Sequence, residues 1–206
     1  MITLYGIPRS RSLRVSWLLE ELQLDWSYKF INFSQGENRA PDFLAISPEG
    51  KVPALQDGDL HLNESAAICL YLAEKYGQGK WLPASGSADS ARHHQWVSFI
   101  ISELEQALWS IGKHKFALPK EQRIPEMLAT AQWEFNKAAT TASGRLPSST
   151  YLFGESPQVA DVLLCHTLNW AVKFEQVLPE NLETYRQTMS ARSAMKKALE
   201  KEQSHS

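Results

Sequence analysis

The hydrophobic period changes once along this chain of 206 residues, and that change restricts the fold more than any other feature. Before residue 77, short stretches with the alternating period of strands are interleaved with stretches that carry the period of helices. After residue 90 only the helical period remains. Such a chain is expected to form a small mixed α/β domain followed by an all-helical one.

The first part of the chain predicts the order strand, helix, strand, irregular loop, hairpin, helix. The segments are strands at 2–5 and 26–33, a helix at 12–22, a hairpin of 52–56 and 60–62, and a helix at 66–76. Asp57-Gly58 supplies the hairpin turn, and Gly77 follows the last helix as a stop signal. Residues 1–77 are therefore the predicted first domain.

Glycine, serine and proline are frequent in residues 78–90, which predicts a linker. Residues 91–206 are the predicted helical domain. Apolar periodicity predicts helices at about 88–115, 126–142 and 159–174, with a short exposed helix near the C-terminus.

Charge and cysteine content restrict the compartment and the partners. The 21 Lys and Arg against 23 Asp and Glu give a net charge of −2, which argues against a nucleic-acid partner. No window approaches the roughly 18 apolar residues of a membrane span, and no signal peptide precedes the first strand. Cys69 and Cys165 are far apart and fit a reducing compartment. We expect a soluble cytoplasmic protein without a membrane or metal partner.

Two motifs flank the predicted hairpin. Lys51-Val52-Pro53 precedes it and Glu64-Ser65 follows it, with Gly36 to Arg39 and Pro41-Asp42-Phe43-Leu44 further upstream. These motifs and the order of the two halves resemble the glutathione transferases, of the cytosolic and bacterial-like type. The resemblance implies an α/β thioredoxin-like N-terminal domain, an all-α helical-bundle C-terminal domain, and glutathione as co-substrate.

The pair Val52-Pro53 stands where an edge strand begins. An unpaired backbone N–H and C=O at such a position can bind an extended peptide by strand addition, and Val52 supplies both groups. The resemblance implies a cis bond before Pro53 and binding of glutathione to Val52. The alternative is an ordinary strand start at Pro53.

The pair Glu64-Ser65 stands where a strand ends and a helix begins. Free N–H groups and the positive end of the helix dipole favour an anion there. The resemblance implies that Ser65 binds the γ-glutamyl carboxylate of glutathione and Glu64 its ammonium, with Arg39 and Lys51 at the glycine carboxylate. Alternatively, Asn63 caps the helix and Glu64 complements the dipole.

The group that ionises the glutathione thiol is expected in the loop between the first strand and the first helix. Lowering a thiol pKa of about 8.5 to 9 by two units requires about 2.7 kcal/mol, which one or two hydrogen bonds supply. Ser10 is the first candidate, with Arg11 adding its field, and the alternatives are the Tyr5 hydroxyl and the field of the two cations Arg9 and Arg11 alone. Ser12 can instead cap the helix, and Tyr5 can be a core residue of the strand.

This loop departs from the family pattern that the resemblance brings with it. The positions of the family's catalytic Ser and Cys fall on Arg9 and Arg11. A mixed disulfide on a protein thiol is therefore disfavoured. In the helical half, Gln158 stands where a Ser or Thr cap is usual, so either Asp161 compensates or the helix starts earlier, at Ser156.

The resemblance implies a homodimeric detoxification enzyme that conjugates glutathione to hydrophobic electrophiles. Aromatic residues expected to line the electrophile pocket are Phe33, Phe99, Trp109 and Phe116. Two other functions remain open: a glutathione-dependent peroxidase or reductase, and a non-catalytic binding or scaffold protein with the same fold.

Overall fold

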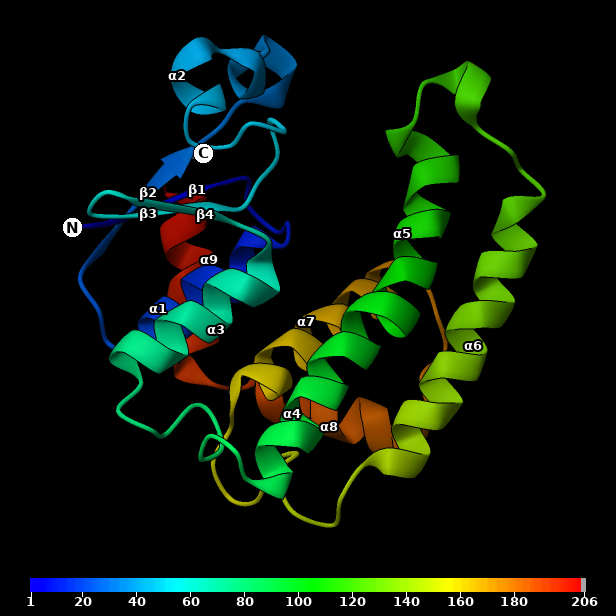
Figure 1. Cartoon of the computed structure of the whole chain (residues 1–206). Helices are drawn as coiled ribbons and strands as arrows, with labels where there is room; N and C mark the ends of the chain where they lie inside the picture. Colours follow the sequence, from blue (N-terminus) through cyan, green and yellow to red (C-terminus); the bar gives the residue numbers. More distant parts are fainter. Residues whose placement is uncertain (205–206) are drawn as a thin grey trace. The chain divides into compact units, whose positions relative to one another are not determined.

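The computed structural model describes residues 1–204, which form two compact units (Figure 1). The first unit contains residues 1–82 together with the C-terminal segment from Ser190 onward, and the second contains Pro83–Met189. The first has a four-stranded mixed sheet with helices, and the second is helical. The predicted fold class is confirmed.

The sheet of the first unit has the order β2-β1-β3-β4. Its strands are β1 (Ile2–Gly6), β2 (Trp26–Phe30), β3 (Ala54–Asp57) and β4 (Leu60–Asn63). β1 is parallel to β2 and antiparallel to β3, and β4 is antiparallel to β3. The crossover between the parallel strands is made by α1 (Ser12–Glu21), as the alternation of periods predicts.

Two strands are shorter than predicted, for identifiable reasons. β2 ends at Phe30 because the Asn32 side chain accepts hydrogen bonds from the N–H groups of Ser34 and Gln35. This starts the 3-10 turn η1 (Phe33–Gln35). β3 begins at Ala54 rather than at Val52, since Pro53 has no N–H to donate to a ladder.

Helices cover both faces of the sheet (Figure 1). α1 and α3 (Ser65–Tyr76) lie on one face, and the short α2 (Pro41–Leu44) lies on the other. The segment expected as an irregular loop therefore contains α2 and the 3-10 turns η1 and η2 (Glu37–Arg39). Under α2, Phe43 packs in a buried cluster with Tyr5, Ile31 and Ala54.

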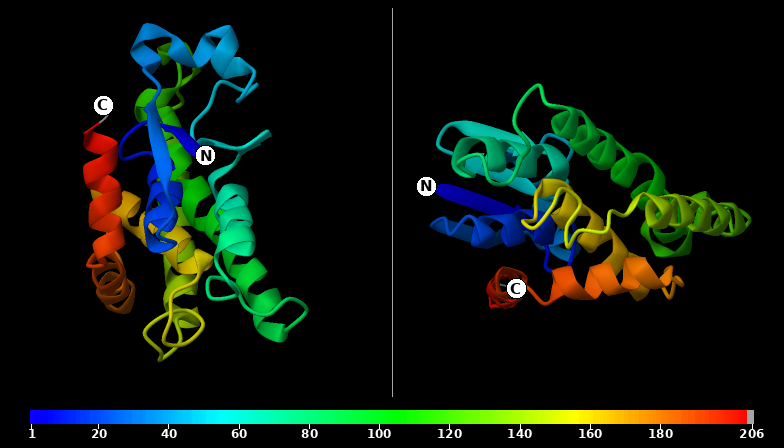
Figure 2. Two further views of the ribbon diagram at one scale, coloured as in Figure 1. Left: turned by 90° about the vertical axis from the view of Figure 1, so that its left-hand side faces the viewer. Right: turned by 90° about the horizontal axis from the view of Figure 1, so that it is seen from below.

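The last described helix, α9 (Ser193–Gln203), packs against α1 in the first unit. Figure 2 shows α9, in red, beside the blue elements of that unit. An ion pair between Arg192 Nη2 and Glu21 Oε2, 2.8 Å apart, joins the two segments. This differs from the sequence prediction, which assigned residues 91–206 to the helical domain and expected an exposed terminal helix. His205 and Ser206 lie outside the described residues.

The second unit is built on five α-helices and the segments between them. They are α4 (Ala88–Phe99), α5 (Gln106–Gly112), α6 (Met127–Arg145), α7 (Val159–Lys173) and α8 (Glu180–Ser190). The π-helical segments η3 (Ile100–Glu105) and η4 (Lys113–Ala117) precede and follow α5, and the 3-10 turn η5 (Lys120–Gln122) comes next. The predicted helix at 88–115 is thus continuous, but α-helical and π-helical segments alternate along it.

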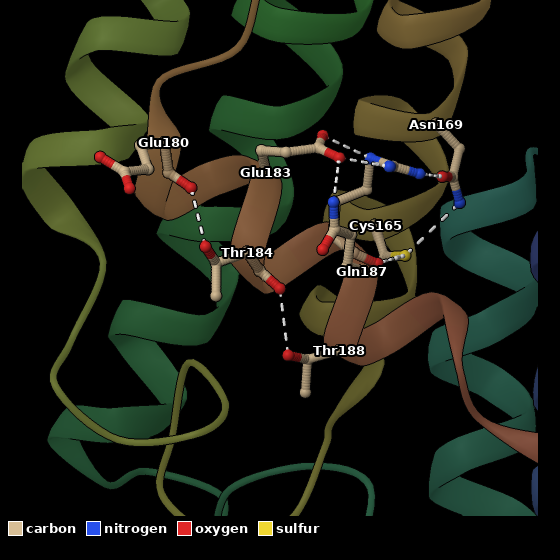
Figure 3. Close-up of polar contacts among 8 residues, drawn as sticks. Cys165, Asn169, Glu180, Glu183, Thr184, Gln187 and Thr188 are labelled. Atoms are coloured by element: carbon tan, nitrogen blue, oxygen red, sulfur yellow. Dashed lines mark hydrogen bonds and ion pairs between the residues drawn. The ribbon is translucent and has the colours of Figure 1, made fainter.

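Polar contacts join α8 to α7 (Figure 3). Arg186 Nη1 donates to Asn169 Oδ1 at 2.7 Å, and Arg186 Nε donates to Glu183 Oε2 at 2.7 Å. The hydrogen bond from Arg186 lowers the pKa of Glu183 to about 2. Buried Cys165 donates its Sγ–H to the Arg186 carbonyl at 3.7 Å. These contacts fix the rotation of α8 on α7.

The Asp161 carboxylate accepts hydrogen bonds at the start of α7, where Gln158 is the N-cap residue. Its Oδ2 accepts from Gln158 N at 2.8 Å, and its Oδ1 accepts from Leu152 N at 2.8 Å and from Tyr185 Oη at 2.6 Å. Of the two predicted alternatives, Asp161 compensation is the one found, and α7 begins at Val159. Burial raises the pKa of the Asp161 carboxyl, while the three hydrogen bonds oppose that shift.

Candidate functional site

The register of the sheet brings three separate segments of the chain to the same end of the strands. Tyr5, one residue before the end of β1, pairs with Ala54, and Ala54 pairs with Asn63 at the end of β4. The loop that follows β1, the residues before β3 and the residues after β4 therefore emerge at the same end of the sheet. We call the residues of these three segments the candidate site.

The entry to β3 presents a backbone edge. Val52 lies outside the ladder, and within residues 1–204 no hydrogen bond joins its N–H or C=O to another group. The Val52–Pro53 peptide bond is cis. A backbone N–H and C=O exposed in this way can pair with an extended peptide.

The start of α3 has an unusual backbone. Glu64 has φ 66° and ψ 106°, a conformation that a non-glycine residue adopts at a cost of about 1 to 3 kcal/mol. Within residues 1–204 no side chain caps this helix, so the alternative in which Asn63 caps it is wrong. Asn63 Oδ1 is instead buried without a partner among the described residues. The N–H groups of the first turn are thus left for an anion.

Ser65, the first residue of α3, is tied to the helix beside it. Its Oγ accepts a hydrogen bond from Arg14 Nη1 at 3.1 Å, and both side chains are buried. The hydroxyl proton of Ser65 then remains to be donated to a ligand. Sequence reasoning missed Arg14, although a charged residue within the apolar stretch of a helix was a usable signal.

The side chains of Arg39 and Lys51 both contact Glu49. Lys51 Nζ lies 2.7 Å from Glu49 Oε2, and Arg39 Nη1 donates to the Glu49 carbonyl at 3.4 Å. The hydrogen bond from Lys51 lowers the pKa of Glu49. Ser47 Oγ fixes the Lys51 backbone by donating to its C=O and accepting from its N–H. The Lys51 side chain is 72% exposed, so it can reach a ligand carboxylate.

The loop from Ile7 to Arg11 leads into α1. Ser10 Oγ accepts from Ser12 N at 3.1 Å and lies 2.9 Å from Ser12 Oγ, where either hydroxyl can donate. Ser10, rather than Ser12, therefore supplies the side-chain acceptor for the first turn of α1. The Ser12 side chain lies close to the backbone of Gly6. Only glycine fits there, because a Cβ at position 6 would lie 2.7 Å from Ser12 Oγ. Arg11 directly precedes α1 in the helical conformation.

Tyr5 is placed in the core. Its hydroxyl donates to Gln56 Oε1 at 3.0 Å, and its ring centroid is 5.9 Å from that of Phe43 under α2. Burial raises the pKa of the Tyr5 hydroxyl. This placement matches the core-side alternative considered for Tyr5 from the sequence.

The second unit carries a row of aromatic rings that starts at Trp109. Trp109 contacts Trp170 at 6.4 Å between centroids, Trp170 contacts Phe174 at 5.7 Å, and Phe174 contacts Phe116 at 6.1 Å. Phe116 is 59% exposed. Trp109 and Phe116 from the predicted set thus come together. Sequence reasoning missed Trp170 on α7 and Phe174 directly after it, because both fell in the helix that was predicted to be buried.

The other two predicted pocket residues lie elsewhere. Phe99 packs edge-on against Trp96, and the Arg145 guanidinium lies 4.8 Å from the centre of its ring. Phe33 lies in η1 of the first unit and is exposed. The row of four rings, Trp109, Trp170, Phe174 and Phe116, is called the aromatic row below.

Residues 1–204 contain neither a metal-binding cluster nor a membrane-spanning helix. No group of three or more His, Cys, Asp or Glu side chains there could hold a metal ion. Among those residues, no helix has the length and apolar character required to cross a membrane.

A protein-family model and curated relatives match the chain. The model described as "Glutathione S-transferase, N-terminal domain" matches residues 1–74. The disulfide-bond oxidoreductase YfcG of Escherichia coli is 32% identical over 169 residues, covering 79% of this chain and 76% of YfcG. The probable glutathione S-transferase GSTF2 of Oryza sativa is 33% identical over 166 residues, covering 77% of this chain and 75% of GSTF2.

Solved structures match nearly the whole chain. A glutathione transferase from Methylococcus capsulatus superposes with a TM-score of 0.87 at 26% identity, covering 98% of this chain and 99% of that one. A glutathione transferase family member from Pseudomonas fluorescens, solved with two glutathione molecules bound, has a TM-score of 0.80 at 26% identity. That match covers 97% of this chain and 92% of the other.

Proposed function

Because this chain belongs to the glutathione S-transferase family, we propose that it binds glutathione at the candidate site and transfers its thiolate to hydrophobic electrophiles. The observation that carries the proposal is the start of α3, which has no side-chain cap and has Arg14 hydrogen-bonded to Ser65. An uncapped helix N-terminus with a buried guanidinium behind it favours a carboxylate.

Each end of glutathione has a matching group in this proposal. The γ-glutamyl carboxylate accepts hydrogen bonds from Ser65 and the first N–H groups of α3, and its ammonium binds Glu64. The cysteinyl backbone pairs with Val52, and the glycine carboxylate binds Lys51 and Arg39. The glutathione-bound relative from Pseudomonas fluorescens supports this ligand.

The thiol is expected to be ionised by Ser10. In this proposal Ser12 Oγ is the donor of the 2.9 Å contact between the two hydroxyls, and Ser10 Oγ donates its own proton to the sulfur. Ser10→Ala should then raise the pKa of bound glutathione by roughly one to two units, because one charge-assisted hydrogen bond is lost. The measurement is thiolate absorbance against pH at saturating glutathione.

Two further variants test the alternative donors in the same assay. Arg11→Ala should raise that pKa less than Ser10→Ala does, and in a salt-dependent way, because Arg11 acts through its field alone. Tyr5→Phe is the matched control, since the Tyr5 hydroxyl is committed to Gln56. A larger shift for Arg11→Ala or Tyr5→Phe than for Ser10→Ala would move the catalytic role to that residue.

The aromatic row would supply the apolar surface for the electrophile. Trp109 lies between the π-helical segments η3 and η4, and π-helical insertions are frequent at functional sites. Conjugation of this kind would serve detoxification. The two cysteines are free and buried, which fits a reducing compartment such as the cytoplasm.

A second candidate activity is glutathione-dependent reduction of disulfides, which the relative YfcG favours. Because both cysteines are buried, this reaction would use glutathione itself as the thiol. Turnover of a model disulfide, compared with turnover of an aromatic electrophile, separates the two activities. Failure of the protein to be retained on a glutathione column would favour the non-catalytic scaffold.

The protein is expected to be a homodimer, as the family resemblance implies. Trp133 on α6 is 62% exposed, which is unusual for a tryptophan of a monomer. Light scattering should give about twice the chain mass of 23.3 kDa. A mass of one chain at micromolar concentration would contradict this expectation.

A further inference from the structure

Glu202, on the C-terminal helix α9, is buried against the loop that the proposed function assigns to the thiol. Its side chain has no exposed surface. Oε2 accepts a hydrogen bond from the Arg9 backbone N–H at 3.1 Å, and Oε1 accepts from Ser16 Oγ at 2.7 Å. The bond to Arg9 joins residues 193 positions apart.

This carboxylate has no cation partner among residues 1–204. The charged groups of the elements packed against α9 have other partners: Glu21 pairs with Arg192, Arg14 donates to Ser65, and Glu20 accepts from Trp26. On β2, Lys29 lies over the Tyr5 ring, and the Tyr28 hydroxyl has its pKa raised by burial and by the charge of Glu202. Burying a carboxylate without a countercharge costs free energy. A role for the Glu202 carboxylate would explain why this position carries a charged residue.

The backbone that Glu202 holds is itself strained. Arg9 has φ 62°, in the left-handed region that non-glycine residues rarely occupy. Strained backbone of this kind persists only where its surroundings fix it. Arg9 is followed directly by Ser10 and Arg11, two of the candidates for thiol activation.

We propose that Glu202 is a positioning residue, whose carboxylate holds Arg9 in its left-handed conformation and thereby places Ser10 and Arg11 at the glutathione sulfur. The proposal rests on the function proposed above. Through α9, the end of the chain thus takes part in shaping the loop near its beginning.

Burial raises the pKa of Glu202 to about 7, so its charge changes near neutrality. The ionised carboxylate is the better acceptor for the Arg9 N–H. The amide should therefore be held more tightly as the pH rises through 7 and less tightly below it.

The test compares Glu202→Gln with Glu200→Gln, an exposed glutamate on the same helix. Hydrogen exchange of the Arg9 amide, corrected for its intrinsic rate, is measured without glutathione. We expect about fivefold to tenfold faster exchange at pH 8 in Glu202→Gln, since a charged acceptor becomes neutral. The rise of protection with pH should vanish in Glu202→Gln and persist in Glu200→Gln.

The second readout is the pKa of bound glutathione, which Glu202→Gln should raise by about half a unit or more while its dissociation constant changes little. Exchange or thiol pKa values equal to those of Glu200→Gln would overturn the proposal. Absence of glutathione binding in the unmodified protein would instead overturn the proposed function. Even then, hydrogen exchange of the Arg9 amide would show whether Glu202 holds the loop, because it is measured without glutathione.

Discussion

Replacing Ser65 by alanine is expected to weaken glutathione binding by roughly 10- to 150-fold, from the loss of about 1.5 to 3 kcal/mol. The substitution removes the hydroxyl that would donate to the γ-glutamyl carboxylate. It also removes the acceptor of the Arg14 guanidinium, which stands behind the helix start. Isothermal titration calorimetry measures the change directly.

A matched control exists at the start of another helix. Ser87 caps α4 in the second unit by accepting from Ser90 N at 3.0 Å. Ser87→Ala should lower the free energy of unfolding by about 1 kcal/mol and leave glutathione affinity unchanged. Equal affinities for Ser65→Ala and the unmodified protein would remove the carboxylate site from α3.

Replacing Asp161 by alanine is expected to lower the free energy of unfolding by about 3 to 5 kcal/mol. The reason is that Gln158 N, Leu152 N and the Tyr185 hydroxyl lose their shared acceptor at once. All three lie in the second unit, so glutathione affinity should change little in the protein that remains folded. Urea unfolding followed by tryptophan fluorescence measures the loss.

Two comparisons sharpen that experiment. Tyr185→Phe removes one of the three hydrogen bonds and should cost about 1 kcal/mol. Asp89→Ala, at an exposed first-turn position paired with Arg92, should cost less than about 0.5 kcal/mol. A loss for Asp161→Ala no larger than that for Asp89→Ala would contradict the capping role.

The order of strands and long helices along the chain could be predicted because it depends on local periodicity. The α2 helix could not, since four residues starting at Pro41 are too few to show a period. Similarly, the periodicity of the terminal helix identified a helix but not the surface it covers. Its burial against α1 depends on contacts such as Arg192 with Glu21, far apart in the chain.

The candidate site divides in the same way. Val52, Glu64 and Ser65 were expected from the resemblance to the family, and each also stands beside a strand or helix end whose backbone groups can bind a ligand. Arg14 and Glu202 lie inside helices, and their partners come from other segments. The left-handed backbone of Glu64 and Arg9 likewise has no signature in residue type.

Calorimetric titration of glutathione into the unmodified protein, beside the dipeptide Cys-Gly that lacks the γ-glutamyl group, tests glutathione binding at the candidate site most directly. The account predicts saturable binding of glutathione, one molecule per candidate site. Cys-Gly should bind at least about tenfold more weakly, because the contacts at Ser65 and Glu64 are missing. Equal affinities for the two peptides would contradict glutathione binding at the candidate site. So would the absence of saturable heat when the glutathione concentration is raised to several millimolar, on the order of a 1 mM dissociation constant or above.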